Sequence, residues 1–324
     1  MNAEVEPEAG AAREPEAGAA REPEAVFIVG VSRSGTTLMR SVLDSHPRLA
    51  VATENHYVGH LLDREGARHY FRRLGDLRQD ATVRALVEFV WSGDFQRRSR
   101  LREISPYWRW LVRTVPRETF EANLLASDRT DRGIFTAVMR TYADVTGKAL
   151  IGEKTPAHLA YVETLLEWYP DARVIHMIRD PRAIYVSELR RRTDRAVTVP
   201  YRQLVRIPFL FRIFVLNQVA LAWTGALRRH RALSGRYPDR YRLVRFEDLV
   251  TDPRATLQEL VRFLGLEWDD VLLDQKVVSK GSRRGERGFD AGAASRWQER
   301  IGTIAGRWLK LLLGGRLREA GYLD

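Results

Sequence analysis

The stretch Val26–Thr37, VFIVGVSRSGTT, decides the fold of this chain. Its first part, Val26–Val31, is a short apolar run, and such a run predicts a strand that is buried on both faces. A turn with two glycines follows, and the apolar residues of Thr36–Leu43 then recur at helical spacing until His46-Pro47 closes the helix. Strand, glycine turn and helix in this order predict the first unit of an α/β fold.

Four more apolar segments predict further strands, and helical patterns separate them. The predicted strands are Leu49–Thr53, Lys148–Gly152, Arg173–Ile178 and Tyr241–Phe246. Helices are predicted across most of residues 55–146, over Ala157–Trp168, from Pro181, and over Pro253–Leu264. Strands that alternate with helices imply a parallel sheet with helices on both faces. The predicted fold class is therefore α/β, with a P-loop-like parallel β-sheet flanked by helices and with helical insertions.

Ligands of such sheets bind at the carboxyl ends of the strands, so the turn Gly30–Thr37 is the first place to look for a site. Its two glycines allow several backbone N–H groups to turn toward one point, and the following helix adds the positive end of its dipole. Ser34, Thr36 and Thr37 supply hydroxyl groups, and Arg33 supplies a guanidinium that suits phosphate or sulfate oxygens. The pattern predicts a phosphate cradle; the alternative is a glycine–serine turn that binds nothing.

The same turn resembles the P-loop pattern GxxxxGK[ST] but has Thr36 in place of the lysine. No acidic strand end follows that would hold magnesium, and a nucleoside-triphosphate kinase needs both groups. A nucleotide that carries a sulfuryl group has less charge there and can be handled without the metal. An ATP-dependent P-loop phosphotransferase remains the alternative enzyme class.

Composition limits the other possibilities. The chain has 324 residues, 44% of them apolar, a net charge of +11 and no cysteine, so disulfides, thiolate zinc sites and thiol nucleophiles are excluded. A body this basic attracts an anion, and nucleic acid, acidic lipid or a polyphosphorylated small molecule would each satisfy that, but no nucleic-acid-binding motif appears. We expect no nucleic-acid partner.

Two segments bear on domain organisation and on membranes. Residues 1–24 repeat EPEAGAAR and lack core-forming residues, so we expect a disordered acidic tail before a single domain at residues 26–324. No signal peptide is visible. Residues 207–226 are long and apolar enough to span a membrane, but Arg212 and Asn217-Gln218 interrupt them. We expect a largely buried helix there and no membrane span.

Several motifs together resemble sulfotransferases that use 3′-phosphoadenosine 5′-phosphosulfate (PAPS), and they are most similar to the tyrosylprotein-sulfotransferase-like branch. They occur in patches from Val26 to Trp297 and are RSGTTLMRSVLDSHP, VIHMIRDPRAIYVS, RFEDLV, FLGL and ASRW. The first resembles the family's 5′-phosphosulfate-binding segment, and the second its 3′-phosphate-binding segment. The resemblance implies the sulfotransferase fold, PAPS as donor, 3′,5′-adenosine bisphosphate as product, and no metal.

The resemblance also implies which residues bind the donor. The 5′ end would be held by Arg33, Ser34, Gly35, Thr36 and Thr37. Arg179 and Ser187 match the residues that hold the 3′-phosphate, and a guanidinium with a hydroxyl suits a phosphate dianion. Arg287 matches a family lysine near the donor, within the run Lys280–Gly288, although a solvated charged loop is the alternative.

Three residues match the family's catalytic positions. Glu54 stands where the general base is expected, and a carboxylate there would accept the proton of the acceptor hydroxyl. Lys154 and Arg33 would stabilise charge on the leaving phosphate and on the sulfuryl oxygens. Thr53 and His56 depart from the branch, and His56 is the alternative base, since many sulfotransferases use histidine.

The acceptor is not encoded in any motif. A hydroxyl on a small molecule, a secondary metabolite or a glycan is expected rather than a peptide tyrosine, because this chain lacks the membrane anchor and disulfides of the animal enzymes. A Cys-free, Arg-rich chain without a targeting signal favours a bacterial cytoplasmic enzyme.

Overall fold

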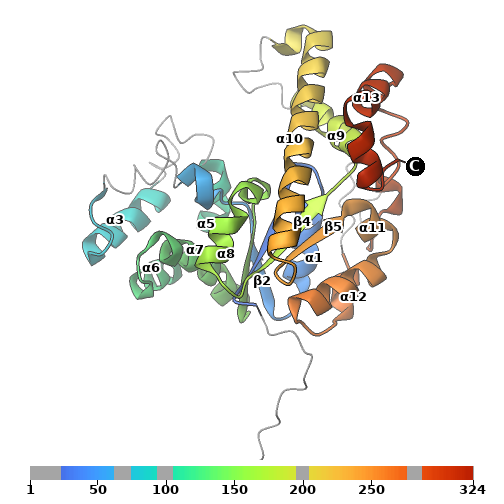
Figure 1. Cartoon of the computed structure of the whole chain (residues 1–324). Coiled ribbons are helices and arrows are strands. Elements are labelled where there is room, and N and C mark those ends of the chain that lie inside the picture. The colour runs from blue at the N-terminus through green and yellow to red at the C-terminus, as the bar shows by residue number, and fades with distance from the viewer. Residues whose placement is uncertain (1–22, 62–73, 93–104, 195–203, 276–286, 324) are drawn as a thin grey trace, which may run out of the picture.

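A five-stranded parallel sheet, with strand order β2-β3-β1-β4-β5, forms the centre of the computed structural model (Figure 1). The structure describes residues 23–61, 74–92, 105–194, 204–275 and 287–323, so the acidic repeat lies outside the described residues. The strands are β1 (Ala25–Gly30), β2 (Leu49–Ala52), β3 (Leu150–Lys154), β4 (Arg173–Ile178) and β5 (Tyr241–Arg245). The predicted α/β fold is confirmed.

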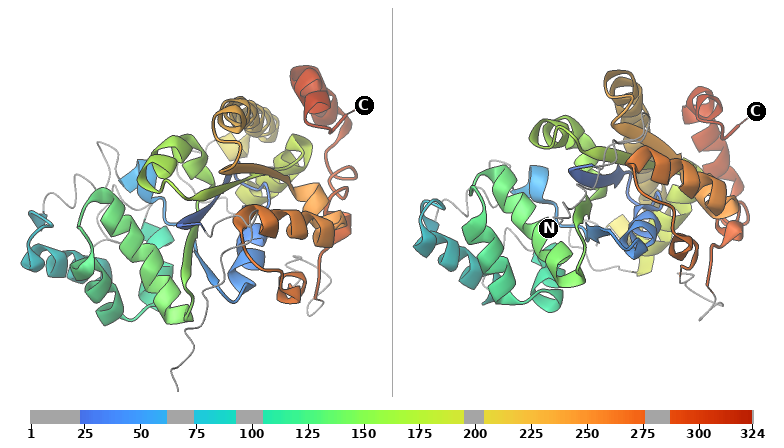
Figure 2. Two further views of the ribbon diagram at one scale, coloured as in Figure 1. Left: turned by 60° about the horizontal axis from the view of Figure 1, so that its bottom comes forward. Right: turned by 90° about the horizontal axis from the view of Figure 1, so that it is seen from below.

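Helices cover both faces of this sheet (Figure 2). The α-helices are α1 (Thr36–Ser45), α3 (Asp80–Trp91), α5 (Ser105–Thr114), α6 (Arg117–Ala126), α7 (Asp131–Thr146), α8 (Val162–Trp168), α9 (Pro181–Asp194), α10 (Pro208–Arg236), α11 (Phe246–Thr251), α12 (Pro253–Leu264) and α13 (Thr303–Glu319). Short 3₁₀ helices are η3 (Pro156–Tyr161), η5 (Leu204–Arg206), η6 (Asp270–Leu273) and η7 (Ala291–Ala293), and η1 (Tyr57–Leu61) is kinked at Val58 and Gly59. The helical insertion predicted between β2 and β3 is thus present.

Strand β1 is central because its side chains serve two cores. All six of its residues are buried. Val26 and Ile28 contribute to the core formed with α1 and α12, whereas Phe27 and Val29 contribute to the core formed with α7 and α8. Alternation of neighbouring side chains between the two faces of a strand explains why the run contains no polar residue.

Strands β1, β2 and β5 end within one residue of their predicted bounds, whereas β3 and the helix predicted over Ala157–Trp168 differ further from the prediction. Strand β3 runs from Leu150 to Lys154, two residues later than predicted, because Gly147 and Lys148 still belong to the C-terminal cap of α7, in which the Lys148 amide donates to the Ala143 carbonyl oxygen at 2.9 Å. The predicted helix Ala157–Trp168 is a 3₁₀ helix, η3, followed by the shorter α8.

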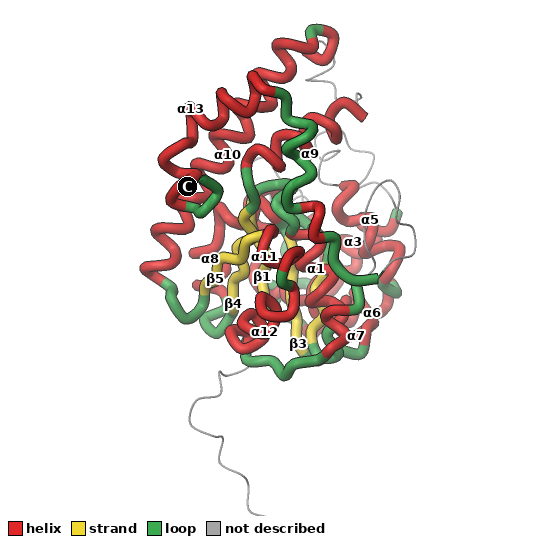
Figure 3. The backbone as a smooth tube through the Cα atoms, turned by 90° about the vertical axis from the view of Figure 1, so that its right-hand side faces the viewer, coloured by secondary structure: helices red, strands yellow, loops and turns green. Residues whose placement is uncertain are grey.

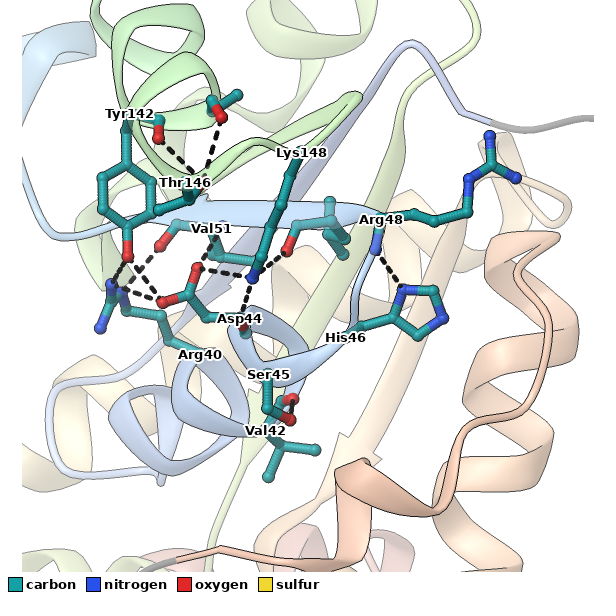
Figure 4. A network of polar contacts seen from close by, with 12 residues as sticks. Arg40, Val42, Asp44, Ser45, His46, Arg48, Val51, Tyr142, Thr146 and Lys148 are labelled. Atoms are coloured by element: carbon teal, nitrogen blue, oxygen red, sulfur yellow. Dashed lines mark hydrogen bonds and ion pairs between the residues drawn. The ribbon is translucent and has the colours of Figure 1, made fainter.

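A polar cluster fixes the end of α1 that is remote from the glycine turn (Figure 4). Asp44 accepts hydrogen bonds from the Tyr142 hydroxyl (2.8 Å), the Val51 amide (2.9 Å) and Arg40 (3.1 Å). Burial, together with this bond to Asp44, raises the pKa of Tyr142 to about 12. The cluster joins α1, β2 and α7, and so holds the glycine turn and α1 in place against the edge of the sheet.

Helix α10 is less buried than its sequence predicts. Among the described residues it is the one helix that is long and apolar enough to cross a membrane. Of its most apolar stretch of 18 residues, 44% is buried in the structure. It packs against α9, α13 and β5, and Trp223 at its middle is fully buried. Phe209 (66% exposed) and Leu221 (73% exposed) nevertheless face outward.

Candidate active site

All five strands end at the same edge of the sheet, and each delivers residues to one candidate site. The glycine turn follows β1, Glu54 lies just beyond β2, Lys154 ends β3, Arg179 follows β4 and Phe246 follows β5. The parallel topology therefore gathers residues that are more than 200 positions apart in the chain.

The turn Gly30–Thr37 has the backbone that an anion cradle needs. Gly30 (φ 152°) and Gly35 (φ 97°) occupy the region that favours glycine. A Cβ on Gly30 would lie 2.5 Å from the Met177 carbonyl oxygen, and one on Gly35 would lie 2.4 Å from the Phe246 ring. Arg33 also has a positive φ (72°), and such strain in a non-glycine residue is typical of functional sites.

The hydroxyl groups of this turn differ in their surroundings. The Ser34 hydroxyl is fully buried and has no hydrogen-bond partner in the structure, while Thr36 is buried and Thr37 is exposed at the start of α1. A buried hydroxyl without a partner costs free energy, so Ser34 fits a ligand oxygen that would complete it. This observation supports the predicted cradle from the chain's own geometry.

Arg33 and Ser187, which belong to the two separate nucleotide motifs, are in direct contact. Arg33 Nε donates to Ser187 Oγ at 2.9 Å. One residue earlier in the turn, Ser32 donates to Glu188 Oε1 at 3.1 Å. Helix α9 therefore holds the glycine turn by two neighbouring side chains.

Glu188 itself was not predicted from the sequence. It is buried, and this burial would raise its pKa, but hydrogen bonds and charge from Arg191 and Arg192 lower it below the usual range. A carboxylate that is ionised and fully bonded keeps the start of the turn fixed without leaving an unpaired buried charge.

Arg179 lies between the glycine turn and β5. Its guanidinium stacks over the Phe246 ring at 4.0 Å and donates to the Ala293 carbonyl oxygen at 2.9 Å. Burial lowers its pKa, and its Nε has no hydrogen-bond partner. Arg179 thus retains a donor for an anion, and the Phe246 ring covers one face of its guanidinium.

A second carboxylate supports the loop after β4. Glu247 accepts from the Asp180 amide (3.1 Å) and from the Tyr322 hydroxyl (3.1 Å), and burial raises its pKa. Arg182 binds Asp180 through two nitrogens and also reaches the Tyr322 carbonyl oxygen (2.8 Å). Residues near position 322 therefore brace the segment that carries Arg179.

Glu54, His56 and Lys154 form one polar group. Glu54 Oε2 accepts from Lys154 Nζ at 3.0 Å, and Glu54 Oε1 lies 3.0 Å from His56 Nε2. Burial would raise the pKa of Glu54, but the His56 hydrogen bond and the Lys154 charge outweigh it and lower the pKa to about 2. Both candidate bases are consequently together, with the predicted lysine in contact with the carboxylate.

Beneath this group lies a fully buried network that was not predicted. Glu153 accepts from the Thr155 hydroxyl and from His158 Nδ1 (3.0 Å). The Thr155 hydroxyl in turn accepts from the amides of Asn55 (3.2 Å) and His56 (3.4 Å). The Thr155 hydroxyl thus uses its one donor and both of its acceptor positions in hydrogen bonds, and these bonds fix the backbone next to Glu54.

The same network extends along the chain after Glu54. His158 Nε2 accepts from the Val58 amide at 3.2 Å, so the His158 proton resides on Nδ1. Trp108 donates to the Asn55 carbonyl oxygen at 3.1 Å. His56, at φ 53°, is therefore held in an unusual conformation by bonds on both sides.

Arg287 is not brought to these residues by any described contact. It is exposed and pairs with Asp274, which is also exposed. The preceding residues of the run, 280–286, lie outside the described residues. Its role near the donor stays a prediction.

Among the described residues, no three His, Asp or Glu side chains are grouped as a metal site requires. What the site presents is an anion cradle with arginines on one side and a carboxylate–histidine–lysine group on the other. Such an arrangement can bind an anionic nucleotide and accept a proton from a nucleophile placed beside it.

Comparison with known proteins agrees with this chemistry. A protein-tyrosine sulfotransferase of Drosophila melanogaster is 23% identical over 254 residues, which are 76% of this chain and 39% of that protein. Protein-tyrosine sulfotransferase A of Caenorhabditis elegans is 24% identical over 257 residues, 79% of this chain and 53% of that protein. The chain thus spans about half the length of these curated relatives or less.

A solved structure has the same fold. The sulfotransferase domain of the Synechococcus PCC 7002 olefin synthase superposes with a TM-score of 0.50 at 22% identity, and covers 93% of this chain and 98% of its own. The model of the sulfotransferase family matches residues 23–270, which include every strand of the sheet and all predicted site residues except Arg287. This chain belongs to the sulfotransferase family.

Proposed function

We propose that this protein transfers the sulfuryl group of PAPS to a hydroxyl acceptor by in-line displacement without a metal. The contact between Arg33 and Ser187 carries the proposal, because it joins the predicted 5′-phosphosulfate segment to the predicted 3′-phosphate segment. A nucleotide with anionic groups at both its 5′ and 3′ ends matches this pair of sites.

The residues present fit such a donor. The glycine turn, with Ser34, Thr36 and Thr37, would hold the 5′-phosphosulfate, and the unpartnered Ser34 hydroxyl would gain an acceptor. Arg179 and Ser187 would hold the 3′-phosphate through charge-assisted hydrogen bonds. The donor supplies an activated sulfur atom; the chain's residues bind it, orient it and manage the proton and the charge.

Glu54 is the proposed base. Its low pKa means that it is ionised at neutral pH and can accept the proton of the acceptor hydroxyl. Lys154 and Arg33 would stabilise charge on the leaving phosphate and on the sulfuryl oxygens. His56 is bonded to Glu54 and would act as its orienting partner or, as the alternative, as the base itself.

The contact between Glu54 and Lys154 would make the basicity of Glu54 depend on whether the donor is bound. While Lys154 is at 3.0 Å, its charge depresses the pKa of Glu54 and makes it a weak base. Movement of Lys154 toward a bound anion would remove this charge and raise the pKa of Glu54. The carboxylate would then become a stronger base when the donor is in place.

For the acceptor we favour a hydroxyl on a small molecule, lipid or glycan. Proteins similar to this chain include a protein-tyrosine sulfotransferase, a carbohydrate sulfotransferase and an omega-hydroxy-beta-dihydromenaquinone-9 sulfotransferase, so the family leaves the class of acceptor open. Thr53 and His56 replace residues of the tyrosine-modifying branch next to the base, and this change favours an acceptor other than peptide tyrosine.

An acceptor screen tests the proposal. The full chain is incubated with PAPS and panels of phenols, aliphatic alcohols, hydroxylated lipids and oligosaccharides, and mass spectrometry detects the gain of one sulfuryl group. Transfer should require PAPS, persist with a metal chelator, and disappear in Glu54→Gln and Lys154→Ala. Magnesium-dependent turnover of ATP, with no thermal stabilisation by 3′,5′-adenosine bisphosphate, would overturn the proposal.

A further inference from the structure

Exposed apolar side chains gather on two helices that pack together. Ten large apolar side chains are exposed in the described part of the chain, and nine of them lie on α13, on α10 or directly before it. They are Ile207, Phe209, Leu210, Ile213 and Leu221, and Ile304, Trp308, Leu311 and Leu312, and we call this set the α10–α13 face. The two helices lie side by side and extend beyond the sheet (Figure 3).

Neither helix needs this face for its own packing. Helix α13 buries Leu309, Leu313 and Leu317 against α10, whereas Ile304, Trp308 and Leu311 lie on the opposite side, 80%, 47% and 78% exposed. A helix that is apolar on both sides is expected to be covered on both sides. The exposed side chains Ile304, Trp308 and Leu311 of α13 are therefore available to contact a lipid surface or another protein.

The two helices that carry this face are cationic, although two of their arginines are ion-paired, Arg231 with Glu319 and Arg236 with Glu163. Residues 207–236 and 303–319 contain nine Arg or Lys and a single acidic residue, Glu319. At the chain's average of 42 acidic residues in 324, about six would be expected in these 47 residues. Arg212, Arg307 and Lys310 are exposed beside the apolar side chains.

We propose that the α10–α13 face docks on the surface of an anionic lipid bilayer. Exposed aliphatic side chains and a tryptophan flanked by arginine and lysine are typical of helices that lie in a membrane interface. Two such faces from two copies of the chain would bring like charges together, so a second copy is the weaker match. The depletion of acidic residues on these two helices specifically favours an anionic surface.

The helices lie on the bilayer and do not cross it. Trp223, at the middle of α10, is fully buried and donates to the Arg179 carbonyl oxygen at 2.9 Å, which ties this helix to the candidate site. Only the outward side chains, such as Phe209 and Leu311, are then free to enter the interface. The charged heads of Arg307 and Lys310 can remain at the lipid phosphates.

Vesicle flotation tests the proposal with the full chain. Vesicles of equal parts phosphatidylglycerol and phosphatidylcholine should bind the protein at least about tenfold more tightly than vesicles of phosphatidylcholine alone, and added salt should weaken this binding. The double variant Ile304→Ser/Leu311→Ser should lose about tenfold or more in binding, because both side chains are almost fully exposed and can enter the interface. Arg307→Gln/Lys310→Gln should lose the preference for the anionic vesicles.

The matched control is Val145→Ser, since Val145 is the tenth exposed apolar side chain and lies on α7 (44% exposed). This variant should bind vesicles as the wild type does. Equal binding to both kinds of vesicle, or an equal loss in Val145→Ser, would overturn the proposal. A dimer in sedimentation that the Ile304/Leu311 variant abolishes would also overturn it and assign the face to a second copy. Binding of 3′,5′-adenosine bisphosphate, measured in the same samples, reports separately on the proposed function.

Discussion

At the level of single residues, Glu54 has two partners that set its acidity in the same direction. The His56 hydrogen bond and the Lys154 charge outweigh the effect of burial and lower the pKa of Glu54 to about 2. Replacement of the carboxylate by an amide keeps the shape and removes the base. Glu54→Gln should therefore lower kcat by about 100-fold or more, with binding of 3′,5′-adenosine bisphosphate changed less than about twofold.

The same kinetic assay separates the two candidate bases. His56→Ala should retain more activity than Glu54→Gln, because on this account the histidine orients the carboxylate. A dead His56→Ala alongside an active Glu54→Gln would reassign the base to His56.

Thr155 offers a second test at this scale, because its hydroxyl holds the Asn55 and His56 amides while it is itself fully buried. Thr155→Val should lower kcat by about tenfold or more as Glu54 loses its position, and Thr155→Ser should restore most of it. The control is Thr141→Val, which removes another fully buried hydroxyl, one bonded within α7 to Ala137.

Both valine variants should lose stability, since both remove a buried hydrogen bond. Only Thr155→Val should lose kcat per folded molecule. An equal kcat in the two variants would show that the network under Glu54 has a purely structural role.

At the level of elements, the polar cluster around Asp44, which joins α1, β2 and α7, should stabilise the fold without contacting the nucleotide. Asp44→Ala leaves the Tyr142 hydroxyl, the Val51 amide and Arg40 without their shared acceptor. The free energy of unfolding should fall by roughly 2–4 kcal/mol, as measured by urea denaturation. An unchanged midpoint would contradict the role assigned to this cluster.

Strands β4 and β5 contain a pH-sensitive element. Burial lowers the pKa of His176 to about 3, and His230 adds to this effect, while His176 Nδ1 is bonded to the Tyr241 hydroxyl. In the unfolded chain the pKa of a histidine is about 6.5, so on acidification the unfolded state binds the proton first. Stability is therefore complete above about pH 6.5 and is lost as the pH falls toward 3.

Between pH 6.5 and 5, His176 should lower the free energy of unfolding with a slope that approaches about 1.4 kcal/mol per pH unit. His176→Gln should make this slope shallower in denaturant titrations at several pH values. A slope that is the same in the variant would assign the pH dependence to other groups.

The sequence predicted the elements better than their polar contacts. The run VFIVGV and the glycine turn specified β1, the turn and α1, because apolar periodicity and glycine placement are local signals. The side-chain contact of Lys148 depends on the Leu49 carbonyl oxygen, 99 residues away. No local pattern contains that information.

In the candidate site, too, some residues could be predicted from the sequence, and the polar contacts that support them could not. Glu54, Lys154, Arg179 and Ser187 follow from motif resemblance, and the structure brings them to one edge of the sheet. Glu153, Thr155, His158 and Glu188 are visible only once the strands are assembled, since a buried polar side chain is recognisable by its partners and not by its neighbours in sequence. The exposure of α10 was likewise not predicted, because an apolar run reads alike whether a core or a lipid surface covers it.

At the level of the whole molecule, the central claim is that the glycine turn and the segment after β4 form one site for a nucleotide with a 3′-phosphate. The direct test is calorimetric titration of the full chain with 3′,5′-adenosine bisphosphate and, separately, with ADP, which has no 3′-phosphate. The bisphosphate should bind at least about tenfold more tightly than ADP, without magnesium, and Arg179→Gln should abolish the difference. Equal affinities for the two nucleotides, or a preference that survives in Arg179→Gln, would contradict this claim.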